Sequence, residues 1–251
     1  GGAGLDVDDC FSCFLYDGTG SSQTITNNID LTEGGLVWLK ARSSSSFSGS
    51  DHWLIDTVNG GTKYLNSNDA GAQAGNQNYI SAFNSNGFTL GTSDAEINFG
   101  SGNSKYTSWT FRKAPKFFDV ITYSGNSTAG RTISHNLGCT VGQVWVKRTN
   151  TSNNWACWHR GIANNKYLQL NSTSQAYSDG GIFWNNTTPS STTVTLGADS
   201  AVNATGSTYV MYVFAHNNND GGFGPDSDQD IIKCGSFTSD GTDTITLGFE
   251  P

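Results

Sequence analysis

The chain alternates apolar and polar residues with a period of two in several short segments. Residues 35–42 read GLVWLKAR and residues 143–148 read QVWVKR, as in strands with one buried face. Residues 208–214, TYVMYVF, are β-branched and aromatic, which is typical of a strand covered on both faces. Asn-Gly and Gly-Gly pairs separate such segments as turns, at residues 59–61, 86–87 and 180–181. No stretch shows sustained helical spacing, so the pattern predicts an all-β fold.

The strand pattern occurs twice in tandem. Tyr16 corresponds to Tyr123, and Val37–Lys40 corresponds to Val144–Lys147, both at an offset of 107 residues. Further landmarks recur in the same order, with offsets between 102 and 107 residues. A copy of roughly 100 residues has the size of a β-sandwich or jelly roll. We therefore predict tandem β-sandwich domains, jelly-roll or lectin-like, at residues 9–113 and 117–219.

A second motif repeats outside the two copies. Residues 1–8 and 221–228 both spell Gly-Gly-x-Gly-x-Asp-x-Asp, and residues 231–251 are similar to the start of each copy. This arrangement predicts linkers at residues 1–8 and 220–230, and the start of an incomplete third repeat at residues 231–251 of a longer array. An unpaired strand that exposes apolar residues promotes aggregation. We therefore expect the apolar residues of this tail to pack against a neighbour; they are Phe237, Ile245, Leu247 and Phe249.

The composition narrows the class of partner. The 251 residues carry a net charge of −8 and the pI is about 4.7, whereas a nucleic-acid binder needs a basic surface. The same charge disfavours a polyanionic membrane surface. The chain has no run of 18 apolar residues, so we expect no membrane insertion. Gly, with 31 residues, and aromatics, at 12%, suit short strands joined by tight turns.

The five cysteines offer two candidate pairings. Cys10 and Cys13 form a CxxC, but residues i and i+3 of a strand point to opposite faces, which disfavours chelation. Cys13 aligns with Val120, which predicts a small core residue. Cys139 and Cys157 could form a disulfide, although five cysteines leave one unpaired.

The second linker contains alternating carboxylates. Asp226, Asp228 and Asp230 have the spacing found in a calcium loop. The glycine expected after them is replaced by Ile231, and no bidentate Glu follows at the expected distance. We favour a solvated linker over a calcium site, and we expect no cofactor.

Groups that could act in catalysis are near one another in sequence but form no repeated arrangement. Ser50, His52 and Asp56 are close in the first copy, and His159 and Arg160 are adjacent in the second. No order of nucleophile, base and orienting group recurs, and no nucleophile elbow is present. We predict that the protein is not an enzyme.

Tryptophan is the residue most suggestive of binding. Trp38 and Trp145 each lie between residues that point inward, so alternation turns them to the opposite face of their strands. That face is either a core layer or an open apolar platform for sugars or partner chains. The candidate glycan contacts are Trp184, Asn185 and Asn186, which lie in a turn-rich stretch, and His159.

The ordered landmarks resemble an uncharacterised sandwich domain found in predicted structural and appendage proteins of marine tailed phages. The motifs that carry the resemblance in the two copies are VWLK (37–40), DTVNGGTKYL (56–65), FNSNGFTLG (83–91), SHNLG (134–138), VWVKR (144–148) and STYVMYVFA (207–215). The resemblance implies a virion appendage protein and supplies no catalytic residues.

Taken with the repeats, the resemblance implies a non-enzymatic module of a tail fibre or surface decoration fibre. Its expected location is the virion surface or another extracellular site. Its expected partners are other copies of itself in an oligomer or fibre, and host surface polysaccharide. A bacterial extracellular adhesin would share this architecture, and a glycan-degrading enzyme would need paired carboxylates in a cleft.

Overall fold

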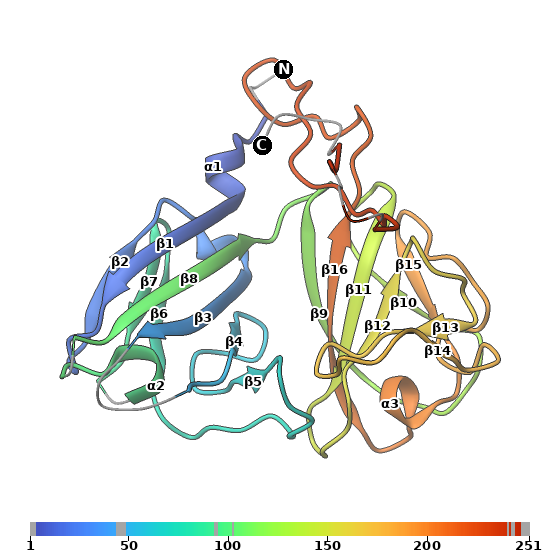
Figure 1. Cartoon of the computed structure of the whole chain (residues 1–251), viewed down its shortest axis with the longest axis horizontal. Helices are drawn as coiled ribbons and strands as arrows, with labels where there is room; N and C mark the ends of the chain where they lie inside the picture. Colours follow the sequence, from blue (N-terminus) through green and yellow to red (C-terminus); the bar gives the residue numbers. More distant parts are fainter. Residues whose placement is uncertain are drawn as a thin grey trace.

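In the computed structural model, which describes residues 4–43, 49–92, 95–101, 103–239, 241 and 244–246, the chain is mostly β. The alternating pattern therefore predicted the fold class correctly. The strands pair antiparallel throughout these residues and form two β-sheet bodies, seen side by side in Figure 1. The helices described are single turns of three or four residues.

The first body consists of two packed sheets. Its elements are α1 (Val7–Cys10), β1 (Phe11–Asp17), β2 (Gln23–Thr26), η1 (Leu31–Glu33), β3 (Gly35–Ser43), β4 (Trp53–Asp56), β5 (Leu65–Asn66), β6 (Ile80–Asn84), β7 (Gly87–Leu90), α2 (Ala95–Asn98) and β8 (Lys105–Arg112). One sheet has the strand order β1-β8-β3-β4-β5 and the other β2-β7-β6. Val37 and Leu39 point from β3 into the core between these sheets, as alternation predicted.

The second body repeats this plan. Its elements are β9 (Phe118–Ser124), β10 (Arg131–Ser134), β11 (Val141–Arg148), β12 (Ala156–His159), β13 (Lys166–Tyr167), β14 (Tyr177–Ser178), β15 (Thr193–Leu196), α3 (Ser200–Asn203) and β16 (Thr208–Ala215). The main sheet has the order β12-β11-β16-β9, and the pair β10-β15 packs on it across a second core. Strand β16 is buried along its length apart from Thr208, as predicted for a strand covered on both faces.

Matching contacts recur in the two bodies. Tyr16 stacks on Tyr106 with ring centroids 5.2 Å apart, and Tyr123 stacks on Tyr209 at 5.1 Å. Tyr16 and Tyr123 each donate the phenol hydrogen, over 2.7 Å, to a carbonyl oxygen in the following short helix, α2 or α3. The residues that aligned at an offset of 107 therefore occupy equivalent positions in space.

The bodies meet through the outward faces of their main sheets. Trp38 and Trp145, which alternation placed on those faces, contact each other edge to face at 5.9 Å. A third apolar cluster surrounds them and includes the fully buried Trp155 and Tyr212. The face of each tryptophan is thus covered by the other copy of the repeat, so neither residue is an open platform.

Buried polar groups cross the same interface. Tyr212 donates to the carboxylate of Asp56 over 2.7 Å, and that carboxylate also accepts from the backbone N–H of Asn59 at 2.8 Å. Trp155 Nε1 donates to the carbonyl oxygen of Asn66 at 2.9 Å. Because burying a polar group is costly unless it is paired, these bonds select one relative placement of the two sheets.

Lys147 is a fully buried cation at this interface. Its ammonium group donates to the carbonyl oxygen of Asn153 at 2.8 Å and to that of Ala70, in the first body, at 3.2 Å. Burial lowers the pKa of Lys147 from 10.5 to about 8, against an opposing effect of Asp69. The folded chain therefore releases this proton at a lower pH than the unfolded chain does.

The buried lysine predicts a dependence of stability on pH. Between pH 8 and pH 10 the unfolded chain binds more protons at Lys147, so the free energy of unfolding should rise with pH through this group. Urea unfolding of the wild type and of Lys147→Met at several pH values measures it. As the pH increases, the free energy of unfolding of the wild type should rise relative to that of Lys147→Met. A difference that is constant with pH would contradict the prediction.

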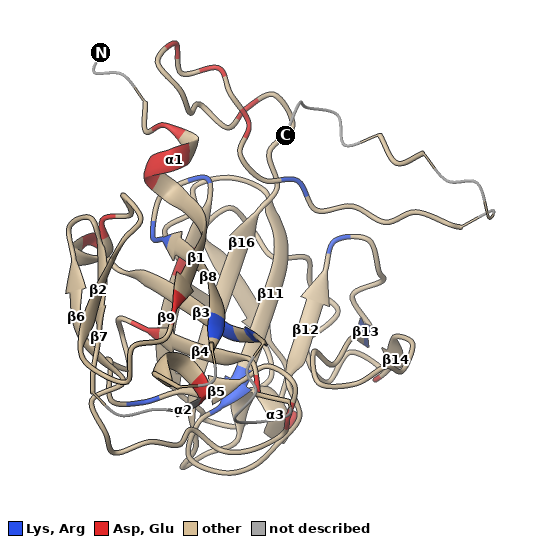
Figure 2. Ribbon diagram, turned by 60° about the vertical axis from the view of Figure 1, so that its left-hand side comes forward, with Lys and Arg blue, Asp and Glu red and all other residues tan. Residues whose placement is uncertain are grey.

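The two glycine-rich linkers lie against each other. The backbone N–H of Gly224 donates to the carbonyl oxygen of Leu5 at 2.9 Å, and a Cβ at Gly4 would lie 2.7 Å from the carbonyl oxygen of Gly222. The described residues of the two matching sequences therefore form one joint, which Figure 1 shows near both termini. Figure 2 shows acidic residues gathered on α1 and on the second linker, residues 220–230.

The tail that follows forms no strand in its described residues, 231–239, 241 and 244–246. Ile231 and Ile232 pack against the apolar clusters of the body. Phe237 and Ile245 are 64% and 50% exposed, so the prediction that they pack against a neighbour is not met within this chain. Leu247 and Phe249 lie outside the described residues.

Candidate functional site

The predicted glycan contacts do not form one surface. Trp184 is fully buried in the core of the second body, so it cannot present its ring to a sugar and the prediction for this residue is wrong. Asn185 and Asn186 are exposed at a turn, where both adopt positive φ of about 50°. His159, at the end of β12, is partly exposed, and its Nδ1 accepts from the backbone N–H of Gly161 at 3.0 Å.

Of the three carboxylates considered as calcium ligands, one closes the linker loop. Asp230 accepts backbone N–H groups of Asn219 and Gly221, at 2.8 and 2.9 Å, and thereby closes the loop. Asp226 and Asp228 are exposed. No group of three metal-ligating side chains occurs within the residues that the structure describes. The three aspartates are therefore not brought together as ligands.

The groups considered for catalysis each have a separate structural partner. Ser50 accepts from the ammonium of Lys40 at 3.0 Å, His52 accepts from Trp38 Nε1 at 3.0 Å, and Asp56 binds Tyr212 at the interface. The three side chains form no hydrogen-bonded series of nucleophile, base and orienting group.

All five cysteines are free thiols, so the possible Cys139–Cys157 disulfide is absent. Cys13 is exposed on β1, where a small core residue was predicted; it is Cys10 that is buried. Cys13 does occupy the position of Val120, since it pairs with Trp109 as Val120 pairs with Tyr212, but this position is buried only in the second body. Burial raises the pKa of the Cys157 thiol to about 12, which makes it unreactive as a nucleophile.

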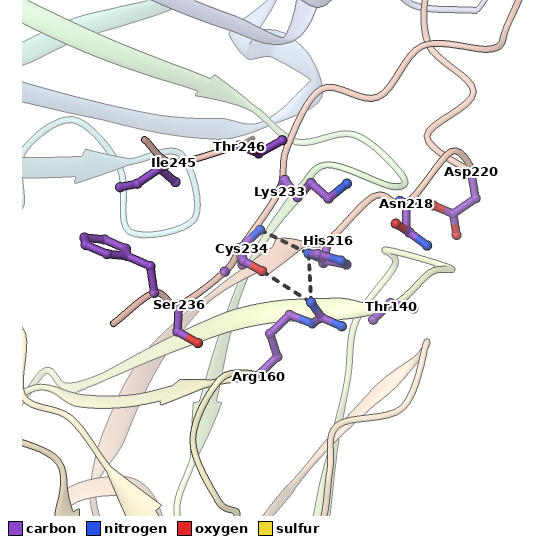
Figure 3. A pocket seen from close by; sticks show the side chains of 12 residues that line it. Thr140, Arg160, His216, Asn218, Asp220, Lys233, Cys234, Ser236, Ile245 and Thr246 are labelled. Atoms are coloured by element: carbon purple, nitrogen blue, oxygen red, sulfur yellow. Dashed lines mark hydrogen bonds between the residues drawn. The ribbon is translucent and has the colours of Figure 1, made fainter. Parts of the chain in front are cut away.

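A cavity of about 760 Å³ lies between the end of the second body and the tail. Its polar lining comes from Thr140, from Arg160 after β12, from His216, Asn218 and Asp220 after β16, and from Lys233 to Ser236 of the tail. Its apolar lining includes Phe237 and Ile245. In Figure 3, Ile245 and Asp220 lie at opposite sides of the view, so the cavity has an apolar end and a charged end.

Two residues after β16 attach the tail to the body. Asn217 Oδ1 accepts the backbone N–H groups of Ile231 and Ile232, at 3.0 and 3.2 Å. His216 Nδ1 accepts the backbone N–H of Cys234 at 3.1 Å. Burial and the nearby Arg160 lower the pKa of His216, which keeps the imidazole in the neutral form that can accept this bond.

Arg160 joins the same network and borders the cavity. Its Nη1 lies 3.4 Å from both His216 Nδ1 and the carbonyl oxygen of Cys234, as drawn in Figure 3. The other guanidinium nitrogens have no hydrogen-bond partner among the described residues. They remain available as donors to a molecule in the cavity.

Sequence reasoning missed most of this site. Arg160 was considered only as a catalytic group beside His159, and His216 and Asn217 were not considered. A run of polar residues directly after a fully buried strand, HNNND at residues 216–220, was the available signal. Asn217 binds residues that are 14 and 15 positions further along the chain. The alternation of apolar and polar residues carries no information about such contacts.

Gly142 is a position where the tail lies close against the body. A Cβ there would lie 2.5 Å from Cys234 Sγ and 2.6 Å from the carbonyl oxygen of Ala215. We expect Gly142→Ala to displace residues around Cys234 and to increase amide hydrogen exchange at residues 231–236. Gly235→Ala is the control, since a Cβ at that glycine meets no atom within 4 Å. Equal exchange in the two variants would contradict this prediction.

The fold and the cavity define a protein of two packed antiparallel β-sheet bodies with an attached tail. The chain belongs to the family described as domain of unknown function DUF7483, whose model matches residues 6–251. The match covers both bodies and the tail. No curated protein and no solved structure matches the chain. The helices in the described part of the chain, with three or four residues each, are too short to span a bilayer.

Proposed function

We propose that this chain is a non-enzymatic structural module of a virion appendage, a tail fibre or surface decoration fibre, that can attach to host surface glycans. The main support is the interface between the bodies, where an aromatic cluster and buried hydrogen bonds join the two repeats. Such an interface turns two sandwiches into one stiff unit, which suits a spacer exposed on a particle. The resemblance of the repeat motifs to phage appendage domains supports the virion assignment.

The proposal of a non-enzymatic role is supported by the partners of the titratable groups. Asp56 and Lys147 are buried at the interface, each with hydrogen bonds inside the chain. Groups buried in this way are part of the interface and are inaccessible to a polymer substrate. Incubation of the pure chain with host surface polysaccharide should release no reducing ends. Steady release that is abolished by replacing a single carboxylate would overturn the proposal.

The location is tested separately. Antibodies against the chain should label virus particles in electron microscopy, at an appendage and at several copies per particle if the module forms a homo-oligomer. Label on the bacterial cell surface, and none on particles, would favour an extracellular adhesin of the same architecture. The two experiments examine different parts of the proposal, so either part can fail alone.

A further inference from the structure

Two cationic groups face the cavity between the second body and the tail and retain unpaired donors. The ammonium group of Lys233 has no hydrogen-bond or carboxylate partner among the described residues. Arg160 uses one nitrogen of its guanidinium for His216 and Cys234. Both side chains line the cavity in a chain whose net charge is −8. Unpaired cations in a recess favour an anionic ligand, and a guanidinium binds a carboxylate especially well.

The remaining polar lining limits which anion would fit. Asp220 lines the same cavity, and one of its carboxylate oxygens already accepts the backbone N–H of Asn218 at 2.8 Å. A carboxylate beside the cations disfavours a dianion, because like charges repel. The Asp220 carboxylate favours a ligand with hydroxyl groups, because a hydroxyl can donate a hydrogen bond to its other oxygen. Asn218 and Thr140 add further groups that can bind hydroxyls.

The other end of the cavity is apolar and exposed. Phe237 and Ile245 leave 64% and 50% of their surfaces exposed there. Pockets for small ligands combine an apolar wall with a few polar groups that fix orientation. A sugar ring has both an apolar C–H face and polar edges, so it matches a cavity with this division.

We propose that this cavity binds a monoanionic, hydroxyl-rich sugar residue, of the uronic acid type found in acidic polysaccharides. Arg160 and Lys233 would bind the carboxylate, Asp220 and Asn218 the hydroxyls, and Phe237 the face of the ring. The inference rests on the adhesive part of the proposed function and names its ligand class. It does not depend on the virion location.

The test is calorimetric titration of the whole chain with trigalacturonic acid. We expect saturable binding that weakens as salt rises from 50 to 300 mM, in contrast to no measurable binding of neutral maltotriose. Lys233→Gln should weaken binding at least five-fold. The fold of the chain should be unaffected, because Lys233 has no partner among the described residues. Lys105→Gln is the matched control, since this lysine pairs with Asp17 on the first body, and it should leave the affinity unchanged.

Three outcomes would overturn the inference: no binding of trigalacturonic acid, equal binding of maltotriose, or equal losses in Lys233→Gln and Lys105→Gln. Inorganic phosphate that competes as well as the acidic sugar would indicate an anion site without sugar selectivity, and it would also contradict the proposal. None of these results bears on the release of reducing ends or on the labelling of particles. A failure here is therefore distinguishable from a failure of the proposed function.

Discussion

Trp155→Ala should lower the free energy of unfolding by about 3–5 kcal/mol, as expected for removing a fully buried tryptophan. Trp155 donates to the carbonyl oxygen of Asn66 in the first body and stacks near Tyr212, which itself binds Asp56. Its loss leaves a cavity and an unpaired carbonyl oxygen between the bodies. We expect differential scanning calorimetry to show one transition for the wild type and two for the variant.

Trp158→Ala is the matched control for this experiment. Trp158 lies three residues further along, is 2% exposed, and packs inside the second body instead of at the interface. Its removal should cost a similar free energy but keep a single transition, because the contacts between the bodies remain. Separate transitions in both variants, or in neither, would show that Trp155 does not couple the two bodies.

Asn203→Ala should destabilise the chain by about 3 kcal/mol, since each buried group left unpaired costs roughly 1–3 kcal/mol. Asn203 is fully buried, accepts the backbone N–H of Asn126 at 3.0 Å, and donates to the carbonyl oxygens of Thr128 and Gly197 at 3.0 and 2.9 Å. Alanine would leave these three backbone groups without their partner. Equilibrium urea unfolding measures the loss.

The repeat supplies an internal comparison for this prediction. Asn98 makes the equivalent contacts in the first body: it accepts the backbone N–H of Thr19 and donates to the carbonyl oxygens of Ser21 and Gly91. Asn98→Ala should therefore cost a comparable free energy. Asn165→Ala, at an exposed asparagine, should change stability by less than about 0.5 kcal/mol. A large effect at only one of the two buried asparagines would contradict their equivalence.

Local pattern predicted much of this fold. The alternation in residues 35–42 placed Val37 and Leu39 in the core and Trp38 on the outer face, and all three lie there. The recurrence of Tyr16 at Tyr123 anticipated the matching stacks in the two bodies. These predictions succeed because side-chain direction along a strand depends on backbone geometry alone, which has a period of two residues.

The candidate site was predicted much less well. Trp184 lies in a turn-rich stretch, which suggested exposure, but its ring fills the core of the second body. Phe237 and Ile245 resemble core residues of a repeat, yet they are exposed beside the cavity. A residue type indicates what a side chain can do, whereas its surroundings depend on segments that are far away in sequence.

The sequence by itself determined that the chain forms strands, that its pattern is duplicated, and which face of the strands at residues 35–42 and 143–148 carries tryptophan. Only the tertiary structure decided what covers those faces. Trp38 and Trp145 are 107 positions apart, and each could have met solvent, a partner chain or the other repeat. The same holds for the tail, which His216 and Asn217 hold through hydrogen bonds that no periodicity reports. The alternation of side chains along a strand follows from the local backbone. Which surfaces pack together depends on apolar area and polar groups that come close only in the folded chain.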